Sequence, residues 1–134
     1  MNENSQKTIL LVDDENLIRD FAAKVLRIHG YEVLTAENGE SAVELCRDGE
    51  TTLDLLLTDY SMPSMNGQQL YSRLQEIYPH MPVLYMSGYQ EDVLEESGTN
   101  DETPFIHKPF TIEKLATKVR ELLRISESSG AMEQ

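Results

Sequence analysis

Polar side chains follow four short apolar runs of the sequence, and their types suit one shared chemistry. They are three carboxylates, a hydroxyl and an ammonium group: Asp13, Asp14, Asp59, Ser87 and Lys108. Three neighbouring carboxylates repel one another and raise one another's pKa values unless a cation lies among them. Oxygen ligands with no His or Cys beside them favour a hard divalent ion, Mg²⁺ or Mn²⁺ in its place.

Asp59 is the candidate nucleophile of this set. A divalent cation, the Lys108 ammonium and the Ser87 hydroxyl would together stabilise a phosphoryl group during its transfer to a carboxylate. Each residue alone could equally cap a helix or face water. Capping by Asp14, however, does not explain why Asp59 and Lys108 stand at corresponding positions after other apolar runs. The joint pattern therefore predicts a phosphoryl-transfer site.

The apolar runs that precede these residues predict strands buried on both faces. They cover residues 9–12, 53–57, 83–86 and 105–106, and a more mixed run at 31–36 suits a sheet edge. Helical periodicity separates them at 17–26, 42–46, 70–77 and 112–123, with a weaker segment at 90–96. This alternation predicts an α/β fold, a doubly wound five-stranded parallel sheet with helices on both faces. Ligands bind such sheets at the carboxyl ends of the strands, where the polar residues stand.

The length and charge of the chain limit its organisation and its partners. Its 134 residues suit one domain, which we expect at residues 6–126, followed by a flexible tail at 127–134. The net charge of −13 repels nucleic acid and anionic membrane surfaces. No apolar run approaches the ~20 residues of a bilayer span. We therefore expect no nucleic-acid partner and no direct membrane contact.

Cysteine usage and the first residues of the chain bear on its location. The single cysteine, Cys46, cannot form an internal disulfide, and residues 1–7 lack the apolar stretch of a signal peptide. Both observations favour a cytoplasmic location.

Five short motifs occur in order along nearly the whole chain. They are Leu11-Val12-Asp13-Asp14-Glu15, Leu57-Thr58-Asp59-Tyr60-Ser61-Met62-Pro63, Asn66-Gly67, Ser87-Gly88-Tyr89 and Lys108-Pro109-Phe110. In this order and at these separations they resemble the receiver domain of two-component response regulators. The resemblance implies a flavodoxin-like architecture. The Ser-Gly-Tyr run is also similar to receivers attached to hybrid sensor histidine kinases, so the chain is either free-standing or part of such a kinase.

The resemblance implies a role for each acidic residue. Asp59 would accept a phosphoryl group from a phosphohistidine on a histidine kinase or a histidine phosphotransfer domain. Mg²⁺ would bind Asp14, Asp59 and the backbone carbonyl of Ser61, with Asp13 helping through water. The chain would then be a phosphoacceptor that catalyses only its own phosphorylation and dephosphorylation, and not otherwise an enzyme.

The resemblance also assigns the remaining residues of the set. Ser87 would hydrogen-bond one phosphoryl oxygen, and Lys108 would pair with another. Phe105 occupies the position of the family's aromatic switch, which follows the hydroxyl inward on phosphorylation. The Lys108–Pro109 peptide bond is expected to be cis. Asn66 stands where many members carry Asp, and we interpret it as the N-cap of the following helix.

Two other functions remain possible for a protein with this group of acidic residues. A Mg²⁺-dependent phosphohydrolase that forms an aspartyl phosphate would share Asp59 and Lys108, but it would need an acid two residues after the nucleophile, where Ser61 stands. A nucleotide- or flavin-binding module would need a glycine-rich loop after the first strand. Here that position holds acidic residues that repel phosphate.

The edge that carries the weak helical segment at 90–96 bears on assembly. The segment is shorter than the ~12–15 residues that give a helix any autonomy, and the polar residues 99–102 follow it. Two copies of a domain with charge −13 also repel each other over a Debye length of ~8 Å. We therefore expect a monomer before and after phosphorylation, with this edge contacting a kinase or phosphotransfer partner.

Overall fold

Five parallel strands form the centre of the protein. The computed structural model describes residues 7–88 and 104–132. The strands are β1 (Thr8–Val12), β2 (Glu32–Ala36), β3 (Leu55–Asp59), β4 (Val83–Ser87) and β5 (Phe105–His107). They pair in the order β2-β1-β3-β4-β5, and every pairing is parallel. The predicted doubly wound parallel sheet is confirmed.

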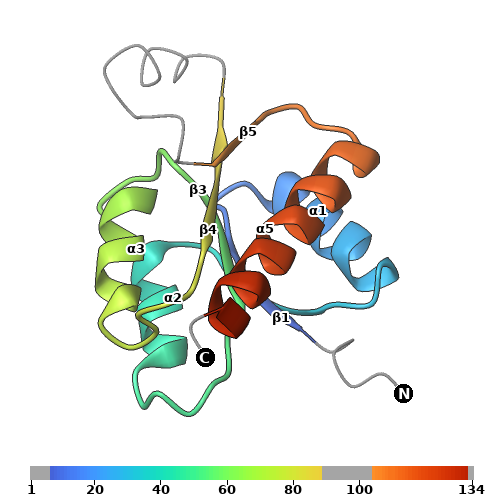
Figure 1. Ribbon diagram of the computed structural model, residues 1–134. Coiled ribbons are helices and arrows are strands. Elements are labelled where there is room, and N and C mark those ends of the chain that lie inside the picture. Colours follow the sequence, from blue (N-terminus) through green and yellow to red (C-terminus); the bar gives the residue numbers. More distant parts are fainter. Residues whose placement is uncertain (1–6, 89–103, 133–134) are drawn as a thin grey trace.

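Helices cover both faces of this sheet (Figure 1). Within the described residues they are α1 (Asn16–Ile28), α2 (Gly39–Cys46), α3 (Gly67–Gln75) and α5 (Ile112–Met132). Helices α1 and α5 lie on one face, and α2 and α3 lie on the other. The weaker helix predicted at 90–96 lies outside the described residues.

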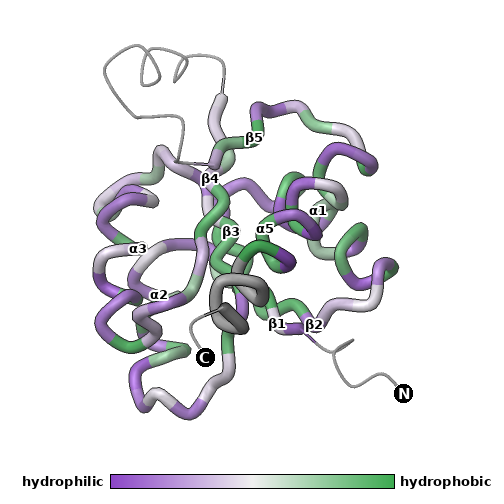
Figure 2. Tube along the Cα trace, viewed as in Figure 1, coloured by the Kyte–Doolittle hydropathy of each residue, from purple (hydrophilic) through white to green (hydrophobic). Residues whose placement is uncertain are grey.

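Each central strand contributes side chains to two hydrophobic layers, because successive strand residues point to opposite faces. Leu11 and Leu57 pack with α1 and α5, whereas Leu10 and Leu56 pack with α2 and α3. Figure 2 shows the hydrophobic residues gathered along the strands, with hydrophilic residues on the outer parts of the helices. The same alternation decides on which face a polar residue at a strand end lies.

The start of α3 is fixed by the predicted N-cap. The Asn66 side chain accepts a hydrogen bond from the backbone N–H of Gln69 (2.8 Å), and the Gln69 side chain accepts one from the backbone N–H of Asn66 (2.9 Å). This reciprocal capping box satisfies two backbone donors that the helix itself leaves unpaired. The Asn-Gly pair therefore begins a helix here and does not form a hairpin turn.

The boundaries of β3 and α5 differ from the sequence prediction. Strand β3 begins at Leu55, not Leu53, and ends at Asp59, because its pairing with β4 continues as far as Asp59 opposite Met86. Helix α5 continues to Met132, through residues 127–132 that the sequence assigns to a flexible tail. No proline interrupts this segment, so backbone hydrogen bonding can continue past the last apolar residues. No helix in the described parts of the chain has the length and hydropathy needed to cross a membrane.

Candidate functional site

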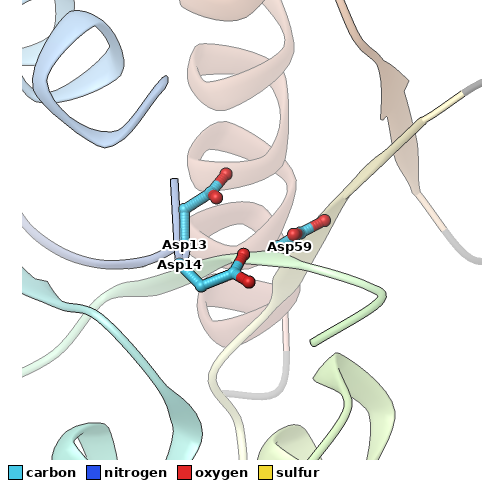
Figure 3. A group of neighbouring side chains, drawn as sticks. All are labelled: Asp13, Asp14 and Asp59. Atoms are coloured by element: carbon cyan, nitrogen blue, oxygen red, sulfur yellow. The ribbon is translucent and has the colours of Figure 1, made fainter. Parts of the chain in front are cut away.

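Three carboxylates meet where β1 and β3 end (Figure 3). Asp13 and Asp14 follow β1 directly, and Asp59 is the last residue of the neighbouring strand β3. One carboxylate oxygen from each lies within 4.8 Å of the others. Asp13 and Asp59 are buried, whereas Asp14 is exposed. The structure thus brings together the acidic residues that the sequence predicted.

Lys108 reaches this cluster from the end of β5. Its Nζ lies 3.2 Å from Oδ2 of Asp13, 3.4 Å from Oδ1 of Asp59 and 3.6 Å from Oε1 of Glu15. The side chain of Lys108 is only 14% exposed, so its ion pairs with the buried Asp13 and Asp59 are poorly screened by water, whereas the Glu15 side chain is 62% exposed. The Lys108–Pro109 bond is cis, as predicted. The contact with Glu15 was not predicted from the sequence, although the run Asp13-Asp14-Glu15 is a signal for it.

Burial makes this cluster electrostatically unfavourable by itself. Loss of solvent raises the pKa of Asp59 from 3.8 to about 7; Lys108 opposes this rise, and the charges of Asp13 and Asp14 add to it. Burial also raises the pKa of Asp13. Burial alone would lower the pKa of Lys108, but the charges of Asp59 and Asp13 outweigh it and leave that pKa raised. One ammonium group therefore does not balance the surrounding carboxylates.

The donor set fits a hard divalent cation such as Mg²⁺. Oδ2 of Asp13 is buried, and Nζ of Lys108, 3.2 Å away, is shared with Asp59 and Glu15. A buried carboxylate is costly unless its charge is balanced, and a cation that prefers oxygen ligands would supply the remaining charge. Asp13, Asp14 and Asp59 are the single group of this kind in the described part of the chain. Ser61 lies two residues past Asp59 with an exposed side chain.

Backbone contacts fix the end of β3 that carries Asp59. The N–H of Tyr60 donates to the carbonyl of Met86 (2.9 Å), and the N–H of Gly67 donates to the carbonyl of Tyr60 (2.8 Å). A Cβ at Gly67 would lie 2.6 Å from the carbonyl oxygen of Asp59, closer than real Cβ atoms approach. Glycine is therefore required at this position because the backbone beneath the carboxylate leaves no space for a side chain.

Ser87 lies at the same edge of the sheet but belongs to the opposite face. It continues the side-chain alternation of Tyr85, which packs with α2 and α3, whereas Asp59 continues that of Leu57, which packs with α1 and α5. The Ser87 hydroxyl lies 3.1 Å from Nδ1 of His107. This pair was not predicted from the sequence, although His107 directly precedes Lys108 in the chain.

Aromatic rings surround the predicted switch residue on that face. The Phe105 ring is half-buried, and its centroid lies 5.8 Å from that of Tyr60 and 5.4 Å from that of Tyr85. Tyr60 directly follows Asp59, and Tyr85 precedes Ser87 by two residues. These rings link the backbone of the candidate nucleophile to Phe105, and only the adjacency of Tyr60 to Asp59 signalled this in the sequence.

Comparison with known proteins identifies the family. The sequence matches the family described as Response regulator receiver domain over residues 9–120. The chain belongs to the response regulator receiver family. It is 36% identical over 118 residues to the response regulator receiver protein CpdR of Brucella abortus, covering 87% of this chain and 97% of CpdR. This receiver domain is thus a component of two-component signalling.

Other relatives carry the receiver within much longer proteins. The chain is 34% identical over 117 residues to the sensor kinase CckA of Brucella abortus, covering 87% of this chain but only 12% of CckA. Among solved structures, the receiver domain of hybrid histidine kinase CckA has a TM-score of 0.73 and 34% identity, covering 87% of this chain and 98% of that one. A response regulator receiver protein from Sinorhizobium medicae has a TM-score of 0.80 and 29% identity, covering 92% and 99%. These likenesses confirm the receiver architecture.

Proposed function

We propose that this receiver accepts a phosphoryl group on Asp59 from a phosphohistidine of a histidine kinase or histidine phosphotransfer domain. A carboxylate oxygen of Asp59 attacks phosphorus, the phosphorus–nitrogen bond breaks, and its electron pair returns to the donor imidazole. The observation that carries the proposal is the buried Asp59 carboxylate, 3.4 Å from Lys108 and beside two further carboxylates.

Lys108, the neighbouring carboxylates and Ser87 each have a separate role in this transfer. The Lys108 ammonium pairs with one oxygen of the incoming phosphoryl group and offsets its charge. Asp14, Asp59 and the backbone carbonyl of Ser61 would hold Mg²⁺, with Asp13 helping through water. When bound, Mg²⁺ supplies positive charge for the phosphoryl oxygens and the crowded carboxylates. Ser87 donates a hydrogen bond to a further phosphoryl oxygen, and Phe105 follows the hydroxyl inward.

An exposed apolar patch on α1 suits the docking of the phosphohistidine partner. Leu17 is 84% exposed and Phe21 is 40% exposed, and the two share one face of the helix because they are four residues apart. The Phe21 ring packs on Phe110, two residues after Lys108, with centroids 6.1 Å apart. A partner helix on this patch would bring its phosphohistidine to the site. The contact edge predicted at 90–102 lies outside the described residues.

Mass spectrometry of the intact protein tests the acceptor. Incubation with Mg²⁺ and a small phosphodonor such as acetyl phosphate should add one phosphoryl group to the protein. The Asp59→Asn variant should add none, because the amide keeps the shape of the carboxylate but lacks its nucleophilic oxygen. Asp20→Asn, which removes one exposed carboxylate of α1, is the matched control and should label normally. Full labelling of Asp59→Asn contradicts the assignment.

The alternative function is a Mg²⁺-dependent phosphohydrolase that passes through an aspartyl phosphate. It shares the Asp59–Lys108 pair, and the same incubation separates the two. Continuous phosphate release from several phosphomonoesters, with no lasting mass increase, would favour the hydrolase. A stable addition of one group favours the receiver function.

A further inference from the structure

We propose that the His107 ring holds the Ser87 hydroxyl away from Asp59 and thereby sets how readily that hydroxyl engages a phosphoryl group. The inference rests on the proposed function, since it concerns the response of Ser87 to a group on Asp59. His107 acts through Ser87, so it is a positioning residue and not a catalytic one.

The sheet register places these two side chains next to each other. Ser87 is the last residue of β4, and its partner across the parallel pairing is His107, the last residue of β5. Paired residues of neighbouring strands point to the same face, so both side chains lie on the α2 and α3 face. Asp59 and Lys108 follow the alternation of the other face. The Ser87 side chain must therefore rotate toward the other face of the sheet to reach a group on Asp59.

The inference requires that Ser87 donates the hydrogen bond to His107. Ser87 is only 1% exposed, so its hydroxyl proton has little access to water. Nδ1 of His107 lies 3.1 Å from the hydroxyl oxygen, within hydrogen-bond distance. A buried donor left unsatisfied is costly. We therefore infer that the hydroxyl donates to Nδ1, which requires the ring tautomer that carries its proton on Nε2.

This direction creates a competition for a single proton. The Ser87 hydroxyl can donate to Nδ1 or to a phosphoryl oxygen, but not to both. A charged oxygen is the stronger acceptor, so phosphorylation draws the hydroxyl away from His107. The N–H of Lys108 donates to the carbonyl of Ser87 at 2.8 Å, so a hydrogen bond joins the backbones of the two strand ends. The exchange itself needs only a rotation of the short Ser87 side chain.

Loss of the His107 acceptor should strengthen the phosphorylated-like state. One hydrogen bond of average strength corresponds to about a fivefold change in an equilibrium constant. We expect His107→Leu to bind beryllofluoride, a phosphoryl mimic, about fivefold more tightly than the wild type in calorimetry with Mg²⁺ present. His107→Asn places an amide oxygen near the position of Nδ1 and should return the affinity to the wild-type value.

A double variant separates this role from a structural one. In the Ser87→Ala background, His107→Leu should not change beryllofluoride affinity, because the competing hydroxyl is absent. The ¹⁵N NMR shifts of the His107 ring in the free wild-type protein should show the proton on Nε2. This measurement does not depend on whether any variant folds.

The possible outcomes keep the two proposals apart. Unchanged or weaker binding by His107→Leu, an equal gain in the Ser87→Ala background, or a proton on Nδ1 would each overturn the role of His107. Beryllofluoride binding that survives in Asp59→Asn, or that is absent from the wild type, would instead overturn Asp59 as the acceptor.

Discussion

Replacing the nucleophile should stabilise the metal-free protein. The perturbation is Asp59→Asn, which removes one charge from the cluster and keeps the side-chain shape. Burial raises the pKa of Asp59 from 3.8 to about 7. At about 1.4 kcal/mol per pH unit, ionised Asp59 lowers the free energy of unfolding by at most about 4 kcal/mol. Lys108 loses one of its ion-pair partners in the variant, so we expect a net gain of about 1–3 kcal/mol at pH 8.

The pH dependence of this gain follows from the raised pKa. In the folded wild type, Asp59 keeps its proton to a higher pH than in the unfolded chain. The stability that this proton contributes is fully present below the unfolded pKa near 3.8 and is lost as the pH rises through about 7. The asparagine variant has no such proton. The stability difference should therefore be largest above pH 7, fall to less than half by about pH 5, and nearly vanish near pH 4.

Urea denaturation of both proteins at pH 8 and pH 5, with a metal chelator present, measures the effect. Asp20→Asn is again the control, because it removes an exposed carboxylate outside the cluster and should change stability by less than about 0.5 kcal/mol. Saturating Mg²⁺ should narrow the difference, because the metal binds the folded wild type more tightly than the variant. A variant that is less stable than the wild type at pH 8, or a difference that does not change with pH, would refute the electrostatic reasoning.

Four further outcomes are expected. Lys108→Ala should lower the free energy of unfolding by about 3 kcal/mol, because it leaves buried carboxylates unpaired, and it should slow labelling by a small phosphodonor. Wild-type stability together with a wild-type labelling rate would show that Lys108 has no role in the site. Asp14→Ala should weaken Mg²⁺ binding in calorimetry more than Asp13→Ala, and the reverse order would make Asp13 the direct ligand. Gly67→Ala should lower the melting temperature and slow labelling, because its Cβ would meet the Asp59 carbonyl at 2.6 Å; a variant with wild-type values for both would contradict the close approach. Light scattering should give a monomer mass with and without beryllofluoride, whereas a doubled mass would show activation-dependent dimers.

The layers of the fold and most of the site could be predicted from the amino-acid sequence. Apolar runs and helical periods depend on local spacing, so they predicted the parallel sheet that the structure has. Asp13, Asp14, Asp59 and Lys108 could be predicted to meet because parallel strands end at one edge of a sheet. The N-cap at Asn66 was likewise predictable, since capping involves neighbours only three residues apart.

The neighbours of each side chain in the site depend on the three-dimensional packing of the strands. The register between β4 and β5 pairs Ser87 with His107, and strand alternation places that pair on the face opposite Asp59. A shift of one residue in register would exchange the faces, and no local pattern in the sequence specifies it. The raised pKa of Asp59 likewise depends on burial beneath elements distant in the chain. These properties arise from long-range packing, which sequence periodicity does not encode.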